Sequence, residues 1–363
     1  MPAVIPRGVT LLIADSSRTG GPEHVLTLAG RLGAEGWEPT VVCPPGSLVD
    51  RCRERHLPVV ALPMAGRSIA VAAPRLRRVV RRLRPGMLHT HGLRAGALAL
   101  AARPDTVAWV HTAHLDDWYV PSLPRRFLHR RLARAVARRA DRQIAVSASV
   151  ATFLRQRVGV AGARVVTIPN GVEPLGRCSG PAPAGRRVGL LASLVPSKGV
   201  DVALRAVASE AGRGLSITIG GSGPELPRLL ELGAALGIMD RVHLVGTVAD
   251  RRAFWSACDV GWVPSRAEPF GLVACEAMSA GVPVVAAAVG GLPWILDAPR
   301  SGVAVAPDDP DGLARATSEL LDDPGRWGQL AAAGLARVAA LFAAERMTAA
   351  TAAVYAEVLG LAV

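Results

Sequence analysis

Two glutamates, Glu268 and Glu276, have the types and spacing best suited to chemistry in this chain. They flank the segment Phe270–Val273, in which a loop containing Gly271 leads into a helical pattern from about Leu272. The first turn of a helix exposes unpaired backbone N–H groups and the positive end of its dipole, and glycine lets a ligand approach the backbone closely. The arrangement suits a diphosphate, with a carboxylate on each side to accept hydrogen bonds from sugar hydroxyls.

The segment 268–293 resembles the donor-binding E-x7-E motif of glycosyltransferase family 4, whose members have the GT-B fold. The following GVPVVAAAVGGLP is similar to the strand and Gly-Gly turn that come next in that family. The resemblance implies that Glu268 contacts the transferred sugar and that Glu276 binds the nucleotide ribose. It also implies that the backbone of Phe270–Val273 approaches the donor. An ordinary capped helix is the alternative interpretation.

Lys198 is the only lysine of the chain and stands in ASLVPSKGVDVALRA (192–206). A mobile ammonium at a loop tip suits a phosphate charge, and the resemblance implies that Lys198 reaches the donor diphosphate. The family usually has an arginine where this chain has Ser193, so one of two cationic contacts is missing. Either another arginine substitutes for it, or donor binding or turnover is weakened. An exposed turn residue is the alternative for Lys198.

Two glycine-rich turns extend the resemblance. GGSGPELPRL, which contains Gly221, resembles a turn that lies near the nucleotide, although a purely structural turn fits it equally well. In DSSRTGGPEH, Gly20 and Gly21 match positions that approach the donor diphosphate and the acceptor. This loop has neither the dinucleotide-binding nor the P-loop spacing. Further along, Asp116 and Asp117 are candidates for binding acceptor hydroxyls.

Four histidines, His89, His91, His111 and His114, lie at the ends of two apolar runs. Residues two apart on a strand share a face, which would also suit a metal. The sequence places no acidic ligand with them, and the resembled family generally needs no bound metal. We therefore expect no metal and no cofactor. His114 matches the family's histidine near the donor sugar, whereas His89 and His91 are expected to be structural or to lie on the acceptor side.

Thirteen short apolar runs alternate with longer helical patterns, which is typical of parallel sheets covered on both faces. Those of the first half are residues 9–15, 40–44, 59–63, 87–91, 107–111, 142–147 and 165–170. Those of the second half are residues 187–193, 215–220, 241–246, 259–265, 283–289 and 302–307. The expected class is α/β: a GT-B arrangement of two Rossmann-like, doubly wound domains facing a central cleft.

The expected domain boundaries follow from the composition and the resemblance. Residues 1–175 are expected to form an N-terminal acceptor-binding domain, and 187–345 a C-terminal domain that binds the nucleotide sugar. Gly, Pro and Ala dominate residues 176–186, which we interpret as the linker. A helix at 346–363 would pack back on the first domain.

Charge is distributed unevenly: residues 1–175 hold 26 arginines against 11 acidic residues, and the remainder is nearly balanced. Two arginine-rich helices are predicted in 74–84 and 124–142, the second with an apolar stripe of Leu128, Leu132 and Val136. They are either solvated surface helices or a site that adheres to an anionic membrane. Nucleic acid is not expected as a partner, because no aromatic residues interleave with the arginines.

The composition rich in alanine and arginine is typical of a GC-rich, bacterial genome, and it contributes to the basicity. Five scattered cysteines without a C-x-x-C pair indicate a reduced cytosolic chain with buried thiols. No signal peptide or transmembrane helix is expected, so the chain would be cytoplasmic, with peripheral attachment to the inner face of the membrane as the further option.

Taken with the resemblance, these features predict a retaining glycosyltransferase that moves a sugar from a nucleotide-diphosphate donor to an acceptor hydroxyl. The acceptor would be lipid-linked, a sugar or a natural product. A binding or partner subunit with weakened catalysis is the first alternative, because Ser193 departs from the family pattern. A sugar-nucleotide epimerase or a phosphorylase of related fold is the second.

Overall fold

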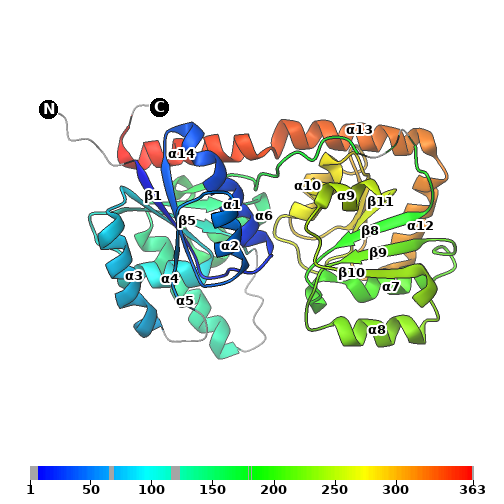
Figure 1. The fold of residues 1–363 in the computed structure, drawn as a ribbon, viewed down its shortest axis with the longest axis horizontal. Helices are drawn as coiled ribbons and strands as arrows, with labels where there is room; N and C mark the ends of the chain where they lie inside the picture. The colour runs from blue at the N-terminus through cyan, green and yellow to red at the C-terminus, as the bar shows by residue number, and fades with distance from the viewer. Residues whose placement is uncertain (1–6, 65–68, 116–122, 179, 181, 362–363) are drawn as a thin grey trace. The chain divides into compact units, whose positions relative to one another are not determined.

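The computed structural model describes residues 7–64, 69–115, 123–178, 180 and 182–361 (Figure 1). The chain divides into two compact units. The first comprises Met1–Gly171 together with Ala344–Val363, and the second comprises Val172–Ala343. The candidate acceptor residues Asp116 and Asp117 lie outside the described residues.

The first unit contains a parallel seven-stranded sheet with the order β3-β2-β1-β4-β5-β6-β7. Its strands are β1 (Gly8–Ile13), β2 (Glu38–Cys43), β3 (Val59–Ala61), β4 (Met87–His91), β5 (Ala108–Ala113), β6 (Arg142–Ala145) and β7 (Val165–Thr167). Ile13 pairs with His91, so β1 and β4 end side by side. The strand order reverses between these two strands, which is where doubly wound sheets bind ligands.

Both faces of this sheet are covered by helices (Figure 1). The helices are α1 (Gly20–Leu32), α2 (Ser47–Glu54), α3 (Ile69–Leu83), α4 (Leu93–Ala102), α5 (Leu123–Arg139), α6 (Ala148–Phe153) and α14 (Ala344–Leu359). Leu11 packs in a core with residues of α1 and α14, whereas Leu12 packs in a second core with residues of α3, α4 and α5. Side chains alternate along a strand, which explains why apolar residues continue without interruption in these strands.

The second unit repeats this topology with six parallel strands in the order β10-β9-β8-β11-β12-β13. Its strands are β8 (Arg187–Leu191), β9 (Ser216–Gly220), β10 (Val242–Gly246), β11 (Val260–Val263), β12 (Val284–Ala287) and β13 (Val303–Val305). Its helices are α7 (Val200–Ala208), α8 (Leu226–Ala235), α9 (Arg251–Ser256), α10 (Leu272–Ser279), α11 (Leu292–Leu296), α12 (Pro310–Leu321) and α13 (Pro324–Leu341). Here the strand order reverses between β8 and β11.

Each of the thirteen apolar runs overlaps a strand, and the predicted α/β class with two doubly wound parallel sheets is confirmed. The predicted stripe of α5 is wrong in its first half. The side chain of Leu128 is 55% exposed and its neighbour Phe127 is 61% exposed, whereas Val136 is buried. Val136 packs against Gly96 of α4, so the helix is buried toward its C-terminal end.

The cysteines of the described residues carry free thiols, and all are buried except Cys178, which is partly exposed. The expectation of a buried thiol is therefore wrong for Cys178, which lies on the irregular segment before β8. Among the described residues, no helix is both long enough and apolar enough to cross a bilayer.

Candidate active site

In the second unit, Lys198 and Glu268 meet at the point where the strand order reverses. Lys198 ends a short 3-10 turn (Pro196–Lys198) in the loop after β8, and Glu268 lies in the loop after β11. Because β8 and β11 are adjacent and parallel, their following loops emerge at the same edge of the sheet. The Nζ atom of Lys198 lies 2.7 Å from Oε2 of Glu268, with the two side chains 26% and 16% exposed.

Gly199 allows the Lys198 turn to sit against the loop after β11. Its φ is +63°, and a Cβ atom there would lie 2.0 Å from the carbonyl oxygen of Pro264. Only glycine fits such a left-handed, closely packed position without displacing backbone. The position of the ammonium is therefore determined by backbone packing as well as by its ion pair.

Arg266 holds the same turn from the other side, a role that sequence analysis missed. Its backbone N–H donates to the carbonyl of Ser197, and its guanidinium donates two hydrogen bonds of 2.8 Å to Asp201 and one of 2.6 Å to Asp308. The guanidinium lowers the pKa of the Asp201 carboxyl. Arg266 is thus committed to carboxylates, although its place two residues before Glu268 could have drawn attention to it.

The E-x7-E segment has the helix that was predicted for it. Gly271, at φ +118°, precedes α10, which begins at Leu272. Glu276 lies one turn into α10, and its Oε2 atom is 3.7 Å from Nη1 of Arg251. Sequence analysis also missed Arg251, which lies in the first turn of α9. The N-terminus of α10 and two carboxylates, each beside a cation, therefore belong to one continuous segment.

The Gly-Gly turn after β12 supports this segment. The backbone N–H of Gly291 donates to the carbonyl of Glu268 at 2.9 Å. A Cβ atom at Gly291 would lie 2.7 Å from the carbonyl oxygen of Phe270. The loop that carries Glu268 is therefore packed backbone to backbone against the turn, which accounts for a glycine at this position of the motif.

At Gly221, the backbone conformation and the packing of the turn require glycine. Its φ is +139°, and a Cβ atom there would lie 1.8 Å from the carbonyl oxygen of Ala192, next to Ser193. The turn after β9 thus packs on the loop after β8. Ser193 itself is partly buried in that loop.

In the first unit, the loop after β1 is organised by Asp15. Its carboxylate accepts hydrogen bonds from the backbone N–H of Ser17 and from the hydroxyls of Ser17 and Thr19, at 2.8 to 3.0 Å. Gly20 and Gly21 then begin α1. A Cβ atom at Gly21 would make only ordinary contact with Ile13, so packing inside the unit does not require glycine there.

The histidines divide into two groups by their hydrogen bonds. His89 lies 2.5 Å from the hydroxyl of Tyr355 and 2.7 Å from that of Thr112. His111 lies 2.8 Å from the hydroxyl of Thr90. Burial lowers the pKa of His111 to about 3, so this ring is neutral at physiological pH. His89 thus links β4 to α14 and to β5, and His111 links β5 to β4.

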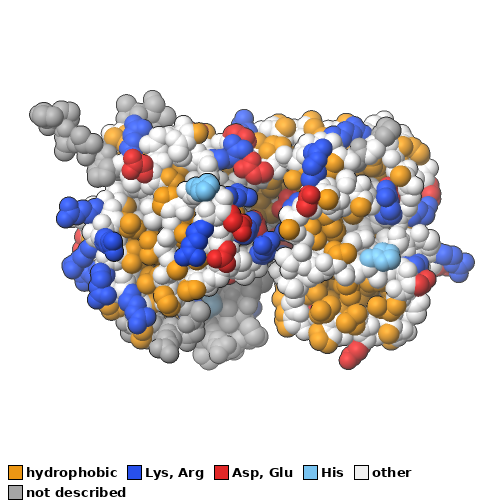
Figure 2. Space-filling model, in the orientation of Figure 1, with side chains coloured by type: hydrophobic (Ala, Val, Ile, Leu, Met, Phe, Trp, Pro, Cys, Tyr) orange, Lys and Arg blue, Asp and Glu red, His pale blue; other side chains and the backbone are white. Residues whose placement is uncertain are grey.

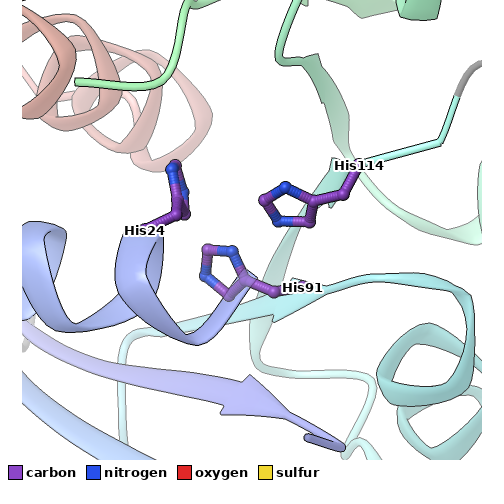
Figure 3. Close-up of side chains that lie close together, drawn as sticks. All are labelled: His24, His91 and His114. Atoms are coloured by element: carbon purple, nitrogen blue, oxygen red, sulfur yellow. The ribbon is translucent and has the colours of Figure 1, made fainter. Parts of the chain in front are cut away.

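The other group consists of His24, His91 and His114, which converge from three elements (Figure 3). His24 lies one turn into α1, His91 ends β4, and His114 follows β5. Burial lowers the pKa of each ring, to about 4 for His114. Sequence analysis did not connect His24 with the others. His24 could have been found from its place one turn into the helix after the first strand, because that helix lies next to the point where the strand order reverses.

Comparison with protein families covers most of the chain. A family described as Glycosyltransferase Family 4 matches residues 18–174, and one described as Glycosyl transferases group 1 matches residues 185–323. A D-inositol 3-phosphate glycosyltransferase of Stackebrandtia nassauensis is 32% identical over 69% of this chain and 63% of its own length. Another, from Salinispora tropica, is 42% identical over 40% of this chain and 33% of its own length. The matched region thus spans a third to just under two thirds of these relatives.

Solved structures share the fold over nearly the whole chain. Anabaena Alr3699/HepE in complex with UDP-glucose superposes with a TM-score of 0.83, at 22% identity, over 96% of this chain and 99% of the other. The sucrose-phosphate synthase of Thermosynechococcus elongatus has a TM-score of 0.83, at 25% identity, over 97% and 99%.

Proposed function

This chain belongs to glycosyltransferase family 4, and from that premise we propose that it moves a sugar from a nucleoside-diphosphate donor to an acceptor hydroxyl. The pair of Lys198 and Glu268 at the reversal of strand order carries the proposal. A cation beside a carboxylate suits a ligand that has a phosphate next to a sugar hydroxyl.

The donor would lie along the segment that leads into α10. Lys198 would contact the diphosphate, Glu268 would accept a hydrogen bond from the transferred sugar, and Glu276 would accept one from the ribose. The N–H groups of Gly271, Leu272 and Val273 would face the phosphates. The uridine nucleotides named with the similar solved structures make UDP-sugars the first donors to test.

We propose a reaction that retains the anomeric configuration. The bond between the anomeric carbon and the diphosphate oxygen breaks, and a bond to the acceptor oxygen forms on the same face. The acceptor proton passes to the leaving diphosphate oxygen. Lys198 and the N-terminus of α10 would stabilise the negative charge that develops on the diphosphate, and His114 would contact the donor sugar. No metal ion enters this scheme.

Ser193 supports a second candidate, a subunit that binds nucleotide but transfers slowly. Arg266 does not replace the missing arginine, because Asp201 and Asp308 occupy its guanidinium. Arg251 forms a longer ion pair, with 3.7 Å between its Nη1 atom and Oε2 of Glu276. Its guanidinium would supply positive charge near the ribose. Binding of a nucleoside diphosphate without transfer to any acceptor would favour this candidate.

The acceptor would lie on the first unit. The names of the relatives place inositol phosphates among the acceptors to test, beside lipid-linked, sugar and natural-product acceptors. The excess of arginine in residues 1–175 favours an anionic acceptor or an anionic surface. Asp116 and Asp117 remain candidates for contacts with acceptor hydroxyls.

A thermal-shift screen tests the donor site. UDP, GDP, ADP, TDP and their sugar conjugates would be added to the wild-type chain and to Lys198→Ala and Glu276→Ala. A ligand that binds the folded state raises the melting temperature by mass action. We expect a rise with one nucleotide, reduced in both variants. A wild-type chain whose melting temperature responds to none of them would argue against the proposed donor site.

We also propose that α5 attaches the chain to an anionic membrane surface. Phe127 and Leu128 are exposed on this helix, and the exposed Arg126, Arg130 and Arg131 lie around them. Figure 2 shows further basic side chains at the surface of the first unit around α3. Apolar side chains that enter the headgroup region, together with about 1 kcal/mol for each basic residue, favour binding to such a surface.

Vesicle co-sedimentation tests this attachment. We expect the chain to bind vesicles that contain anionic lipid at low salt, and to bind weakly when Phe127 and Leu128 are both changed to serine. The matched control changes Leu226 and Leu230, which are exposed on α8 of the second unit. Equal binding by both double variants, or none by the wild type, would refute attachment through α5.

A further inference from the structure

One outer edge of the second sheet differs from the other sheet edges among the described strands. Strands β3 and β7 are the outer strands of the first sheet, and β10 and β13 are those of the second. β3, β7 and β13 have three residues each and a proline within two residues of one end, whereas β10 has five residues. The stretch from Val242 to Ala249 contains no proline and no Lys, Arg, Asp or Glu. Short length, prolines and charges normally keep a sheet edge from pairing with another chain, and β10 has none of these protections.

Apolar side chains are exposed along the β10 edge. Val245 of the strand is 51% exposed, and Met239, in the turn before the strand, is 39% exposed. His243 also lies at the surface. Val242 and Leu244, which alternate with His243 and Val245, pack against the core of the second unit instead. One face of β10 is therefore buried, whereas its other face is exposed.

The crossover helix α8 has an exposed apolar stripe beside this edge. Leu226, Leu230 and Ala234 follow one another at intervals of four residues, so they lie on one side of the helix, and all three are exposed. Leu232, about 200° further round the helix, packs into the core that contains residues of α7. Because connections between parallel strands are right-handed, the side of α8 away from α7 faces outward beyond β10. Figure 2 shows apolar side chains gathered on the second unit around α8 and β10.

We propose that β10 and the exposed stripe of α8 form the contact between two copies of this chain. A two-fold axis at this edge places β10 antiparallel to its copy and joins the two six-stranded sheets into one. β10 pairs with β9 in regular register over 242–244, before the register shifts toward Gly246, so this regular stretch is the part that pairs with the copy. The same axis brings α8 antiparallel to its copy, so that the two stripes of Leu226, Leu230 and Ala234 bury one another.

The combination of a strand and a helix at one edge indicates a second copy rather than another partner. An extended peptide could pair with β10, but it would leave the stripe of α8 exposed. A second copy supplies both a strand and a helix, each in the place where the first copy lacks a neighbour. The side chains of this surface are uncharged, and the second half of the chain is nearly balanced in charge, so two copies meet without bringing like charges together.

The size of the surface sets the expected strength of the contact. The surface is two elements wide, and the ten residues of α8 extend about 15 Å. It is therefore smaller than the roughly 800 Å² that each partner contributes to a standard stable interface. We expect a reversible dimer with a Kd of about 1–100 µM, which corresponds to a binding free energy of about 5–8 kcal/mol.

Analytical ultracentrifugation of the full-length chain, without nucleotide or lipid, tests the contact. Over a concentration range that spans this Kd, the mass of the wild type should rise from that of one chain toward that of two. Val245→Lys and Leu230→Lys each bring a charge close to its own copy and should raise the Kd at least about tenfold. Val71→Lys, at an exposed valine of α3 in the first unit, is the matched control and should dimerise like the wild type.

A charge-swap mixture tests the two-fold arrangement. Leu230→Glu should also weaken the dimer by itself, whereas an equimolar mixture of Leu230→Glu and Leu230→Lys should dimerise more tightly than either variant alone. These positions are exposed, so the variants should fold, which circular dichroism checks. A wild type that keeps the mass of one chain throughout, or Val245→Lys and Leu230→Lys variants that dimerise as tightly as the wild type, would overturn the proposal. A mixture no more dimeric than its separate components would also overturn it.

Discussion

The two sheets of this chain reverse their strand order in the same way, but the side chains at the two points of reversal differ in charge. In the second unit, strands β8 and β11 place a lysine and a glutamate 2.7 Å apart, both partly exposed. In the first unit, strands β1 and β4 lie beside a group of histidines that burial keeps neutral. A charged pair suits a phosphate and a sugar, whereas neutral imidazoles suit hydrogen bonds with hydroxyl groups. One topology therefore places two different sets of side chains at its point of reversal.

The largest expected effect tests the charged edge of the second unit, where Lys198 and Glu268 meet. If the proposed function holds, Lys198→Ala should lower kcat by about 10²–10³, because it removes a cation that stabilises the leaving diphosphate. The unfolding free energy should fall by less than about 1 kcal/mol, since the ion pair is partly exposed. Steady-state kinetics and urea denaturation measure the two quantities. A kcat within threefold of the wild type would show that Lys198 has no such role.

The next effect tests the backbone that positions Lys198. Gly199→Ala would bring a Cβ atom to 2.0 Å from the carbonyl oxygen of Pro264 at a left-handed φ. We expect the unfolding free energy to fall by about 2–4 kcal/mol. Gly237→Ala is the control, because its φ is +66° and no heavy atom lies within 4 Å of the added Cβ. Equal losses in the two variants would mean that close packing at Gly199 is unimportant.

In the first unit, a change of one hydroxyl tests the hydrogen bond of His89. Tyr355→Phe deletes the partner of the buried His89 nitrogen and should lower the unfolding free energy by about 1–3 kcal/mol. Thermal and urea denaturation measure it. An unchanged stability would indicate that the hydrogen bond between α14 and β4 contributes nothing to the first unit.

The smallest effect depends on pH. The Arg266 guanidinium lowers the pKa of Asp201 from its ordinary 3.8. The ionised carboxylate therefore stabilises the fold fully above that value, and this stabilisation disappears as the pH falls through the lowered pKa. At neutral pH, Asp201→Asn should be about 1–2 kcal/mol less stable than the wild type, and the gap should narrow in acid. Asp311→Asn, at an exposed position, is the control, and its difference in unfolding free energy from the wild type should not change with pH. A difference for Asp201→Asn that is the same at every pH would contradict a stabilising role for the ionised carboxylate.

The charged edge was predictable because its residues lie in short motifs. Glu268, Gly271 and Glu276 are eight positions apart at most, and the helix that contains Glu276 was predicted from the same stretch. Short uninterrupted apolar runs likewise predicted the strands, since both faces of each sheet are buried. The contact between Lys198 and Glu268 spans 70 positions and was not predicted, because the resemblance implied only that each residue contacts the donor.

The histidine edge was less predictable, because it depends on strand order. His24 and His114 lie 90 positions apart and meet only because β1, β4 and β5 are neighbours in the sheet. The bonds of Arg266 depend in the same way on loops that follow different strands. The exposure of Leu128 was missed because spacing shows a stripe but not how far a neighbouring helix covers it.

Calorimetric titration of the wild-type chain with the nucleoside diphosphate selected by the screen tests the central claim most directly. Glu276→Gln keeps the size of the side chain but removes its charge, and Glu319→Gln is the control, an exposed glutamate of α12 outside the candidate site. The account predicts one site in the wild type, binding at least about tenfold weaker in Glu276→Gln, and unchanged binding in the control. Equal affinity in all three proteins would contradict a nucleotide site at the start of α10.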